Sequence, residues 1–378
     1  MNFELSEDQI LIRDMARDFA TQRIVENALQ WDREHGFPRE LVAEMAELGL
    51  LGMTFPEKFG GAEVDMVSYV LAMMEIANGC SSVAVMTGVN HLVCEVIYQY
   101  GTDDHKEKYL KHLASGQGIG AFCLSEPQAG SDAQNQKTRA LKENGQYKIS
   151  GKKAYITNGK YADLFVVTAL TATTPKEISV FLVEKDTPGL IIGAPEEKMG
   201  QRASDTVEVT LDSVSVPEEN LIGGVNGFKA MLGGLNSGRI GVAAMCCGIS
   251  QCALDLAVEY AKEREAFGGT LADLQAIQFK LADMATQLEA SKLLTLQAAD
   301  LKDRGENFIT AASMAKLYAS ETCNRVVNEA LQIHGGNGYI QEYMIEKLYR
   351  DARVTTIYEG ASEVQKLVIA RQVLKGRK

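Results

Sequence analysis

The sequence has no Cys-x-x-Cys pair and no group of neighbouring histidines, so it offers none of the common zinc-binding patterns. Its seven cysteines are an odd number, which also argues against a disulfide framework. Several lie in apolar helical surroundings, as Cys246 and Cys247 do, where a reduced cysteine behaves as a small hydrophobic side chain. We therefore expect no metal site and a reducing compartment.

An excess of positive charge is also missing. The net charge is −12 at pH 7 and the pI is about 5.1, which argues against nucleic acid or an anionic membrane as a partner. The first residues are acidic, unlike a signal or transit peptide, and no apolar run reaches the ~20 residues that span a bilayer. We expect a cytoplasmic protein that binds neither nucleic acid nor membrane.

Lysine and arginine are absent between Phe59 and His105. This stretch carries apolar side chains at helical spacing, including Tyr69 and Met73, and therefore predicts buried helix. The helix could be plain bundle core or the wall of an apolar pocket, and the two interpretations are equally supported. For His91, a core or surface role is favoured over a second proton-transfer group.

The chain changes character twice along its 378 residues, which are too many for one hydrophobic core. Ser6 and Gln9 form a capping box that opens a first helix. The fold class we predict is α+β, with an N-terminal α-helical domain over 1–117, a middle antiparallel β domain over 118–227, and a C-terminal four-helix bundle over 228–378.

Short β-branched and aromatic runs separated by turn signals predict the strands of the middle domain. The expected strands are 119–124, 147–149, 153–156, 164–169, 178–183 and 207–216. Helical spacing predicts the helices on either side. The expected helices are 41–50 and 67–77 before the β domain, and 228–235, 240–264, 274–303, 309–333, 340–349 and 362–374 after it.

Two segments of the β domain carry groups that could bind an acceptor-rich ligand. The loop over 122–132 offers hydroxyls and backbone N–H groups, and Tyr155 and Thr157 are expected on one face of a strand. For each segment alone, a hairpin turn is favoured over a binding site. Near the C-terminus, Glu359 and Glu363 lie four residues apart, which alone would indicate two solvated acids on one helix face.

Together with other motifs, these segments resemble the acyl-CoA dehydrogenase family, in particular its short-chain, butyryl-CoA dehydrogenase-like members. The matching segments, in the family's order, are 122–132, 155–159, 202–204, 238–239, 264–268, 332–338 and 358–360. They are spread over all three parts of the chain. The resemblance implies the same helical, β-barrel-like and helical-bundle architecture, with FAD at the junction and a homotetramer as the assembly.

The resemblance also implies how FAD would be held. Ser125 would lie near the pyrimidine edge of the flavin, Thr157 near N5, and Tyr155 against the rings, while Arg264 and Phe267 would reach the FAD of a neighbouring subunit. Ala361 departs from the threonine common in the family, and Glu363 replaces an amide. The implied cofactor residues are Phe122, Leu124, Ser125, Ser131, Tyr155, Thr157, Arg264, Phe267, Gln275, Gln332, Gly335, Gly336, Ala361 and Glu363.

Glu359 is implied to be the base that removes the α-proton of an acyl thioester. Some relatives carry this base just before the arginine of the 238–239 motif, but Gly238 cannot serve, so the role falls to Glu359. Burial around an apolar acyl chain is expected to raise the pKa of this carboxylate. The implied substrate contacts are Ser131, Asn236, Arg239, Tyr358 and Gly360.

The expected activity is FAD-dependent α,β-desaturation of a short-chain acyl-CoA, with electrons passed to electron-transferring flavoprotein. Branched or alicyclic acyl groups, an enoyl-CoA reductase running in reverse, and an oxidase remain open alternatives. A non-catalytic acyl-CoA-binding protein would be favoured by a missing base or broken flavin loops, and the sequence shows neither. Dicarboxylic acyl chains are disfavoured because the stretch between Phe59 and His105 holds no cation.

Overall fold

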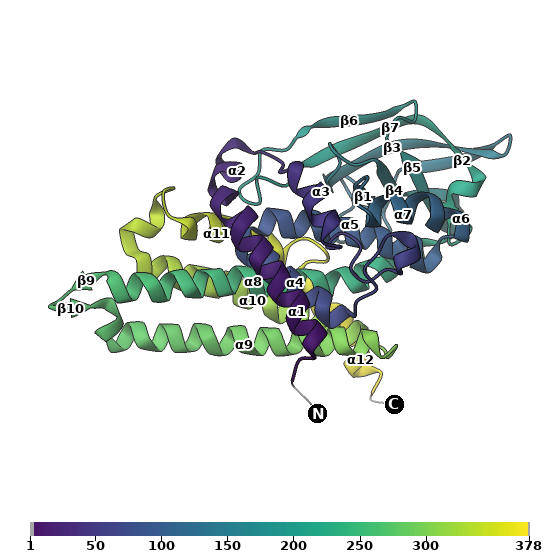
Figure 1. Cartoon of the computed structure of the whole chain (residues 1–378). Coiled ribbons are helices and arrows are strands. Elements are labelled where there is room, and N and C mark those ends of the chain that lie inside the picture. The colour runs from purple at the N-terminus through teal and green to yellow at the C-terminus, as the bar shows by residue number, and fades with distance from the viewer. Residues whose placement is uncertain (1–3, 377–378) are drawn as a thin grey trace.

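The computed structural model describes residues 4–376. Figure 1 shows long helices running lengthwise along the molecule, a twisted β-sheet at one end, and N-terminal helices crossing the long ones. The chain therefore has the predicted order of helical, β and helical parts.

The N-terminal part begins with α1 (Glu7–Phe19), and the predicted capping box is present. The Ser6 hydroxyl accepts from the Gln9 N–H, while the Gln9 side chain accepts from the Ser6 N–H. The other helices of this part are α2 (Ala28–Glu34), α3 (Glu40–Glu47), α4 (Met66–Gly79), α5 (Ser81–Tyr100), α6 (Asp103–His105) and α7 (Lys111–Ala114).

Helices α4 and α5 make up most of the stretch without lysine or arginine, and most of their residues are buried. The prediction of buried helix is confirmed. Both helices pack on the C-terminal helix α8 (Phe228–Glu263), and this contact forms the centre of the largest hydrophobic core.

The middle part is one sheet in the order β6-β7-β3-β2-β4-β5-β8, with β1 paired to β4. Most pairs are antiparallel as predicted, but β1 runs parallel to β4 and β2 meets β4 in parallel at one position, so the sheet is mixed. The strands are β1 (Gly120–Cys123), β2 (Arg139–Glu143), β3 (Gln146–Thr157), β4 (Leu164–Thr173), β5 (Lys176–Glu184), β6 (Leu190–Pro195), β7 (Thr206–Pro217) and β8 (Leu221–Ile222).

Strand β3 joins two segments that the sequence predicts as separate strands, 147–149 and 153–156. Two irregularities in its pairing with β7, one between Ile149 and Gly151 and one between Lys153 and Ile156, interrupt the alternation that reveals a strand in sequence. Strands β2 and β6 were not predicted, because most of their residues are exposed or only partly buried.

The C-terminal part contains three long helices, α8, α9 (Gln275–Asp303) and α10 (Ile309–His334), followed by α11 (Met344–Ala352) and the shorter fourth bundle helix α12 (Ser362–Leu374), which packs on α10. A two-stranded hairpin, β9 (Glu265–Ala266) and β10 (Gly269–Thr270), links α8 to α9.

Helix α8 is continuous where the sequence predicted two helices, 228–235 and 240–264. Its glycines do not break it, because they allow close contact with α4 and α5. A Cβ atom at Gly234 would lie 2.7 Å from Val96 Cγ2, and one at Gly241 would lie 2.8 Å from the Tyr69 hydroxyl oxygen. Packing therefore outweighs the low helix propensity of glycine.

Among the described residues, α8 is also the one helix long and apolar enough to cross a membrane. However, 78% of its most apolar window is buried inside the protein, as in the core helix of a folded domain.

Candidate active site

The segment from Tyr358 to Gly360 forms a strained turn between a 3-10 segment (Arg353–Thr356) and α12. Glu359 and Gly360 both have left-handed backbone conformations, with φ of +52° and +90°. Such a conformation costs a non-glycine residue about 1–3 kcal/mol and persists only where surrounding contacts hold it. Here the Gln365 side chain donates to the Glu359 carbonyl (3.2 Å) and the Gly360 carbonyl (2.9 Å).

The turn places the Glu359 carboxylate against α8 and α5. A Cβ atom at Gly238 would lie 3.3 Å from Glu359 Oε2 and 3.4 Å from Leu92 Cδ1. Glu359 Oε2 is buried and has no hydrogen-bond partner among the described residues. An unsatisfied buried oxygen is uncommon in folded proteins and marks a place where a ligand group could bind.

Burial raises the pKa of Glu359 to about 6, and the positive charges of Lys316 and Arg239 limit that rise. Neither cation forms an ion pair with this carboxylate within residues 4–376, so its charge is only partly balanced. A carboxylate with this pKa is largely ionised near neutral pH but is a stronger base than an exposed one, which suits general-base catalysis. The predicted rise in pKa is confirmed.

Arg239 lies beside this carboxylate on α8 and is buried rather than on an amphipathic helix surface. Its guanidinium donates to Asn236 Oδ1 (2.9 Å) and to the Ser313 hydroxyl (3.2 Å), while its Nε has no partner in the described part of the chain. Burial lowers the pKa of Arg239, and Glu359 opposes this effect. Two predicted substrate contacts, Asn236 and Arg239, thus lie next to the predicted base.

Tyr358 also belongs to this cluster, because its hydroxyl accepts from the Gln201 side chain (3.1 Å). Gln201 comes just before the 202–204 motif and has φ of +49°. Burial raises the pKa of Tyr358 well above its ordinary value, so the phenol stays protonated. Sequence reasoning missed Gln201, Gln365 and Lys316. For Lys316 a signal existed, since it interrupts a helical stripe of small apolar residues at 312, 315 and 319.

The second cluster of predicted residues lies at the sheet, on β1, β3 and the loop after β1. Ser125 O accepts from the Ala154 N–H (2.9 Å), which ties the loop to β3. Phe122, Ser125 and Thr157 are partly buried, Leu124 is buried, and Ser131 is exposed. The loop thus leaves its hydroxyls accessible while its backbone is anchored.

A buried ion pair stabilises this loop. Lys153 Nζ lies 2.8 Å from Glu126 Oε1 and also donates to the Leu124 carbonyl (3.3 Å). Glu126 in turn accepts from the Lys137 N–H (2.7 Å). Although burial disfavours the charged form, Lys153 and these donors hold the pKa of Glu126 at about 2. This ion pair could not be predicted from sequence, because lysine and glutamate are usually exposed.

Tyr155 does not sit in a regular strand position. It has φ of +60°, lies at the second irregularity of β3, and is 71% exposed. Tyr155 and Thr157 are both more exposed than Ile156 between them, but the irregularity means that Tyr155 does not hold a regular strand position. The exposed ring stays available to pack on a flat ligand.

Most of the remaining predicted cofactor residues lie at the other end of the molecule. Arg264 and Phe267 are exposed in the hairpin between α8 and α9, and Figure 1 shows this hairpin at the end opposite the sheet. Gln275 is exposed at the start of α9, and Gln332, Gly335 and Gly336 are exposed where α10 ends. The ends of α8 and α10 meet, because the Asn337 amide donates to the Tyr260 hydroxyl (3.0 Å). Ala361 is partly buried and Glu363 exposed, both next to Glu359.

His91 and Glu95 are two of the buried polar residues in the stretch without lysine or arginine. His91 lies 2.8 Å from the Thr54 hydroxyl and packs on Tyr69 at 4.2 Å between ring centroids. Burial lowers the pKa of His91 to about 3, so it is a neutral core histidine. Glu95 pairs with Lys302 of α9 (2.7 Å), so a cation does reach this region from another helix but is already neutralised.

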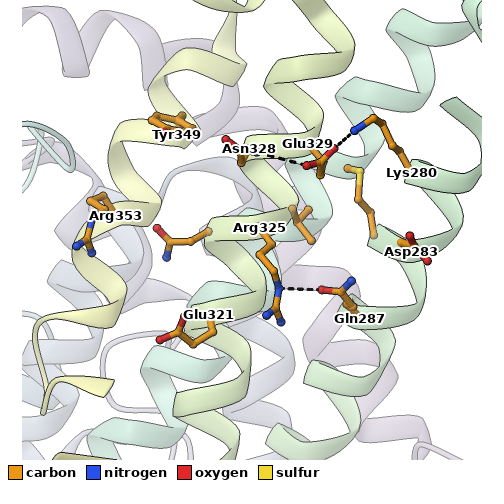
Figure 2. Close-up of a pocket in the computed structure, with 12 residues that line it drawn as sticks. Lys280, Asp283, Gln287, Glu321, Arg325, Asn328, Glu329, Tyr349 and Arg353 are labelled. Atoms are coloured by element: carbon orange, nitrogen blue, oxygen red, sulfur yellow. Dashed lines mark hydrogen bonds and ion pairs between the residues drawn. The ribbon is translucent and has the colours of Figure 1, made fainter. Parts of the chain in front are cut away.

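A surface cavity of about 580 Å³ lies elsewhere, between α9, α10 and α11. Figure 2 shows its polar lining, where Lys280 pairs with Glu329 and Arg325 donates to Gln287. None of the predicted site residues lines this cavity.

The structure thus holds a partly balanced carboxylate with a buried oxygen next to a buried arginine, and it holds an anchored polar loop at the sheet. Models of the acyl-CoA dehydrogenase N-terminal, middle and C-terminal domains match residues 6–117, 121–214 and 225–374. The chain belongs to the acyl-CoA dehydrogenase family, and is therefore an oxidoreductase acting on CH–CH bonds.

Its relatives include short-chain and reductive enzymes. The chain is 46% identical to the mitochondrial short-chain specific acyl-CoA dehydrogenase of Bos taurus, over 98% of this chain and 91% of the relative. It is 43% identical to acryloyl-CoA reductase (NADH) of Anaerotignum propionicum, over 99% of this chain and 96% of the relative. The solved structure of butyryl-CoA dehydrogenase from Megasphaera elsdenii is similar with a TM-score of 0.97 and 41% identity, covering 99% and 100% of the two chains.

Proposed function

We propose that this protein is an FAD-dependent acyl-CoA dehydrogenase for short acyl chains, in which Glu359 removes the α-proton. The observation that carries the proposal is the Glu359 carboxylate itself, which is buried against Gly238, lacks a partner for Oε2 among the described residues, and has a pKa of about 6. A residue that served only structure would be expected to have its buried oxygens satisfied.

The other residues of the turn orient the substrate in this proposal. The Glu359 backbone N–H makes no hydrogen bond within residues 4–376, so it is free to donate to a thioester carbonyl. A donor there would stabilise the negative charge that develops as the α-proton leaves. Tyr358, Gly360 and the Asn236–Arg239 pair would hold the acyl-CoA beside the base, and Ser131 would contact its CoA part.

The residues at the sheet fit the cofactor that the family implies. The loop over 122–132 offers hydroxyls and N–H groups on an anchored backbone, and the exposed Tyr155 ring offers a flat apolar surface. FAD bound there would accept the β-hydride at flavin N5. Phe122, Leu124, Ser125 and Thr157 would hold the flavin, with Ala361 and Glu363 near the dinucleotide.

The packing of α5 on α8 supports a short, uncharged acyl chain as the substrate. Leu92 and Val96 of α5 approach Gly234 and Gly238 closely, leaving little room between the helices. Lys302, which reaches the α5 side of this region, is already paired with Glu95 and is therefore not free to bind a distal carboxylate. A branched or alicyclic acyl group is the alternative to test in the same panel.

A second candidate is reduction of an enoyl-CoA by the same site, favoured by the 43% identity to an acryloyl-CoA reductase. For the dehydrogenase we propose electron-transferring flavoprotein as the acceptor, and a cytoplasmic homotetramer as the working form. The electron acceptor and the homotetramer rest on the family resemblance, and the cytoplasmic location rests on the cysteine usage of the sequence.

The test is anaerobic titration of the purified protein with straight, branched and alicyclic acyl-CoAs. We expect a yellow protein whose flavin absorbance is bleached by a short-chain thioester. Glu359→Gln should keep its flavin but lose about 10²–10⁴-fold in turnover, the usual contribution of a general base. Glu47→Gln, at an exposed acid of α3 that belongs to none of the predicted sites, is the control and should retain activity.

Full activity in the Glu359→Gln variant would exclude Glu359 as the base. If no saturated thioester bleaches the flavin but an enoyl-CoA reoxidises the reduced protein, the reductase is the correct assignment. Absence of bound flavin in freshly purified protein would argue against both.

A further inference from the structure

Lys316 is a buried cation to which the proposed reaction assigns no role. It lies on α10 and has no exposed surface. Its ammonium group donates to the Gly360 carbonyl (2.9 Å), in the turn that carries Glu359.

Comparison with the other fully buried lysines shows why Lys316 is unusual. Among the described residues, Lys153, Lys316 and Lys347 are the lysines with no exposed surface. Lys153 is paired with Glu126 (2.8 Å) and Lys347 with Asp351 (2.6 Å), whereas Lys316 has no ion-pair partner in that part of the chain. A buried charge without a counter-ion is costly, which indicates that its position serves something other than stability.

The Lys316 bond completes a two-sided hold on the strained turn. The Gly360 carbonyl accepts from Lys316 on one side and from the Gln365 side chain on the other, and Gln365 also reaches the Glu359 carbonyl. Both carbonyls of the left-handed pair are therefore fixed by side chains from α10 and α12. The direction of the Glu359 side chain depends on these bonds, because rotation of either peptide would move the carboxylate away from Gly238.

Lys316 also acts through its charge. The charged or titratable groups that face it are Cys246 and Arg239 of α8, Glu321 of α10, and Glu359. Burial lowers the pKa of Lys316 to about 8, and Arg239 adds to this lowering. In turn, Lys316 opposes the burial-induced rise in the pKa of Glu359 more strongly than Arg239 does.

We propose that Lys316 is a positioning residue for the base: with Gln365 it holds the Glu359–Gly360 turn in its left-handed form, and its positive charge keeps the Glu359 carboxylate ionised. The inference rests on the proposed function, since it assigns a role relative to the α-proton base. It predicts that the charge of Lys316 and the hydrogen bonds that hold the turn affect α-proton removal in separate, measurable ways.

The test measures exchange of α-deuterium with solvent from [²H₃]acetyl-CoA, a thioester that has no β-carbon. Proton removal is thereby followed without any hydride transfer. Lys316→Met removes both the charge and the bond, Gln365→Leu removes only hydrogen bonds, and Lys316→Arg keeps the charge. Lys316→Gln, which retains a neutral donor, replaces the Met variant if the latter does not fold.

We measure the exchange rate against pH, where the acidic limb of the profile reports the ionisation of Glu359. For Lys316→Met or Lys316→Gln we expect this limb to move about one pH unit upward, because a neighbouring opposite charge is lost. Lys316→Arg should restore the limb to its wild-type position. Gln365→Leu should lower the plateau rate about tenfold without moving the limb, because a displaced base loses rate while its electrostatic surroundings stay the same.

An unmoved limb in both neutral Lys316 variants, with folded protein and normal flavin content, would overturn the inference. So would a limb that moves equally in Gln365→Leu. Failure of the proposed function looks different: the wild-type protein itself would neither exchange the α-deuterium nor show bleaching by any acyl-CoA.

Discussion

Glu359 combines a left-handed backbone, a desolvated carboxylate and an unsatisfied oxygen, each of which disfavours folding. The rest of the fold must hold these features in place, through Gln365, Lys316 and the close contact with Gly238. Strain concentrated at one acid is typical of a functional site rather than of a helix surface.

Stability should therefore rise when the charge at Glu359 is removed. The folded pKa of about 6 lies above the ordinary value of 4.5. Ionisation thus destabilises the fold fully above the folded pKa, and this penalty is relieved as pH falls toward the unfolded pKa. We expect Glu359→Gln to be up to about 2 kcal/mol more stable than wild type at mildly alkaline pH, and equal to it below about pH 4. Urea unfolding at several pH values checks this, and a constant difference across pH would contradict it.

Gly238 is the second residue on which the position of the base depends. A methyl group there would lie 3.3 Å from Glu359 Oε2 and 3.4 Å from Leu92 Cδ1, tighter than normal contact. We expect Gly238→Ala to lower turnover about tenfold, the cost of a small misplacement of the base, while flavin content is kept. Steady-state kinetics with flavin quantification measures both. Unchanged turnover would show that the carboxylate has room to move.

At the residue scale, the sequence identified Glu359, Arg239 and Asn236 because they lie in or beside motifs that resemble a family. It missed Gln365 because a glutamine in a helix is usually exposed, and its partners are backbone carbonyls that carry no sequence signal. It missed Lys316 although the small apolar residues around that lysine on its helix were a signal. The left-handed conformations of Tyr155 and Glu359 were equally invisible, since neither residue type favours them.

At the scale of elements, the glycines of α8 allow α4 and α5 to pack closely against it. A Cβ atom at Gly248 would lie 2.2 Å from the Met74 carbonyl oxygen of α4, which no side-chain movement can relieve. By contrast, a Cβ atom at Gly88 of α5 would meet Met73 Cε at 3.8 Å, an ordinary contact. The same substitution should therefore have opposite effects at the two positions.

We expect Gly248→Ala to destabilise the protein by about 1–3 kcal/mol, because α4 and α8 must separate. Gly88→Ala should stabilise it by up to about 1 kcal/mol, because alanine is the better helix former. Thermal and urea unfolding of the two variants side by side provides the comparison. Equal effects at both positions would show that the α4–α8 contact adjusts freely.

Element prediction succeeded where one physical signal dominated. The capping box at Ser6 and the buried helices α4 and α5 were predicted correctly, because local hydrogen bonding and hydrophobic spacing determine them. The break predicted near 236–239 was wrong because tertiary contact with α5 outweighs glycine propensity. Strands β2 and β6 escaped notice because partners in the sheet, rather than their own burial, hold them in place.

At the scale of the whole molecule, Asp351 joins the three parts of the chain. It is fully buried on α11 and accepts from the Ser81 hydroxyl of α5 (2.7 Å), from the Gln201 N–H that follows the β6 strand (2.5 Å), and from Lys347 (2.6 Å). Burial opposes its ionisation, but Lys347 and the other donors hold the pKa of Asp351 below its ordinary value.

We expect Asp351→Asn to destabilise the protein by about 3–5 kcal/mol, because Lys347 is left buried without a counter-ion. In the wild type, the depressed pKa means that this contribution is present above about pH 4 and is lost on further acidification. Calorimetry should show a lower melting temperature and less cooperative unfolding of the helical and β parts. Lys347→Met with Asp351→Leu is the control, and should recover much of the loss.

The exposed hairpin between α8 and α9 has a consequence for the measured affinity of FAD. Phe267 is 94% exposed at its tip, far from the sheet that would hold the flavin of the same chain. If it completes the cofactor site of a neighbouring subunit, as the family resemblance implies, then cofactor binding and subunit association are thermodynamically linked, and each strengthens the other. Flavin release would then increase on dilution, and Phe267→Ala would weaken assembly only while FAD is present. Apparent FAD affinity would be a property of protein concentration as much as of sequence.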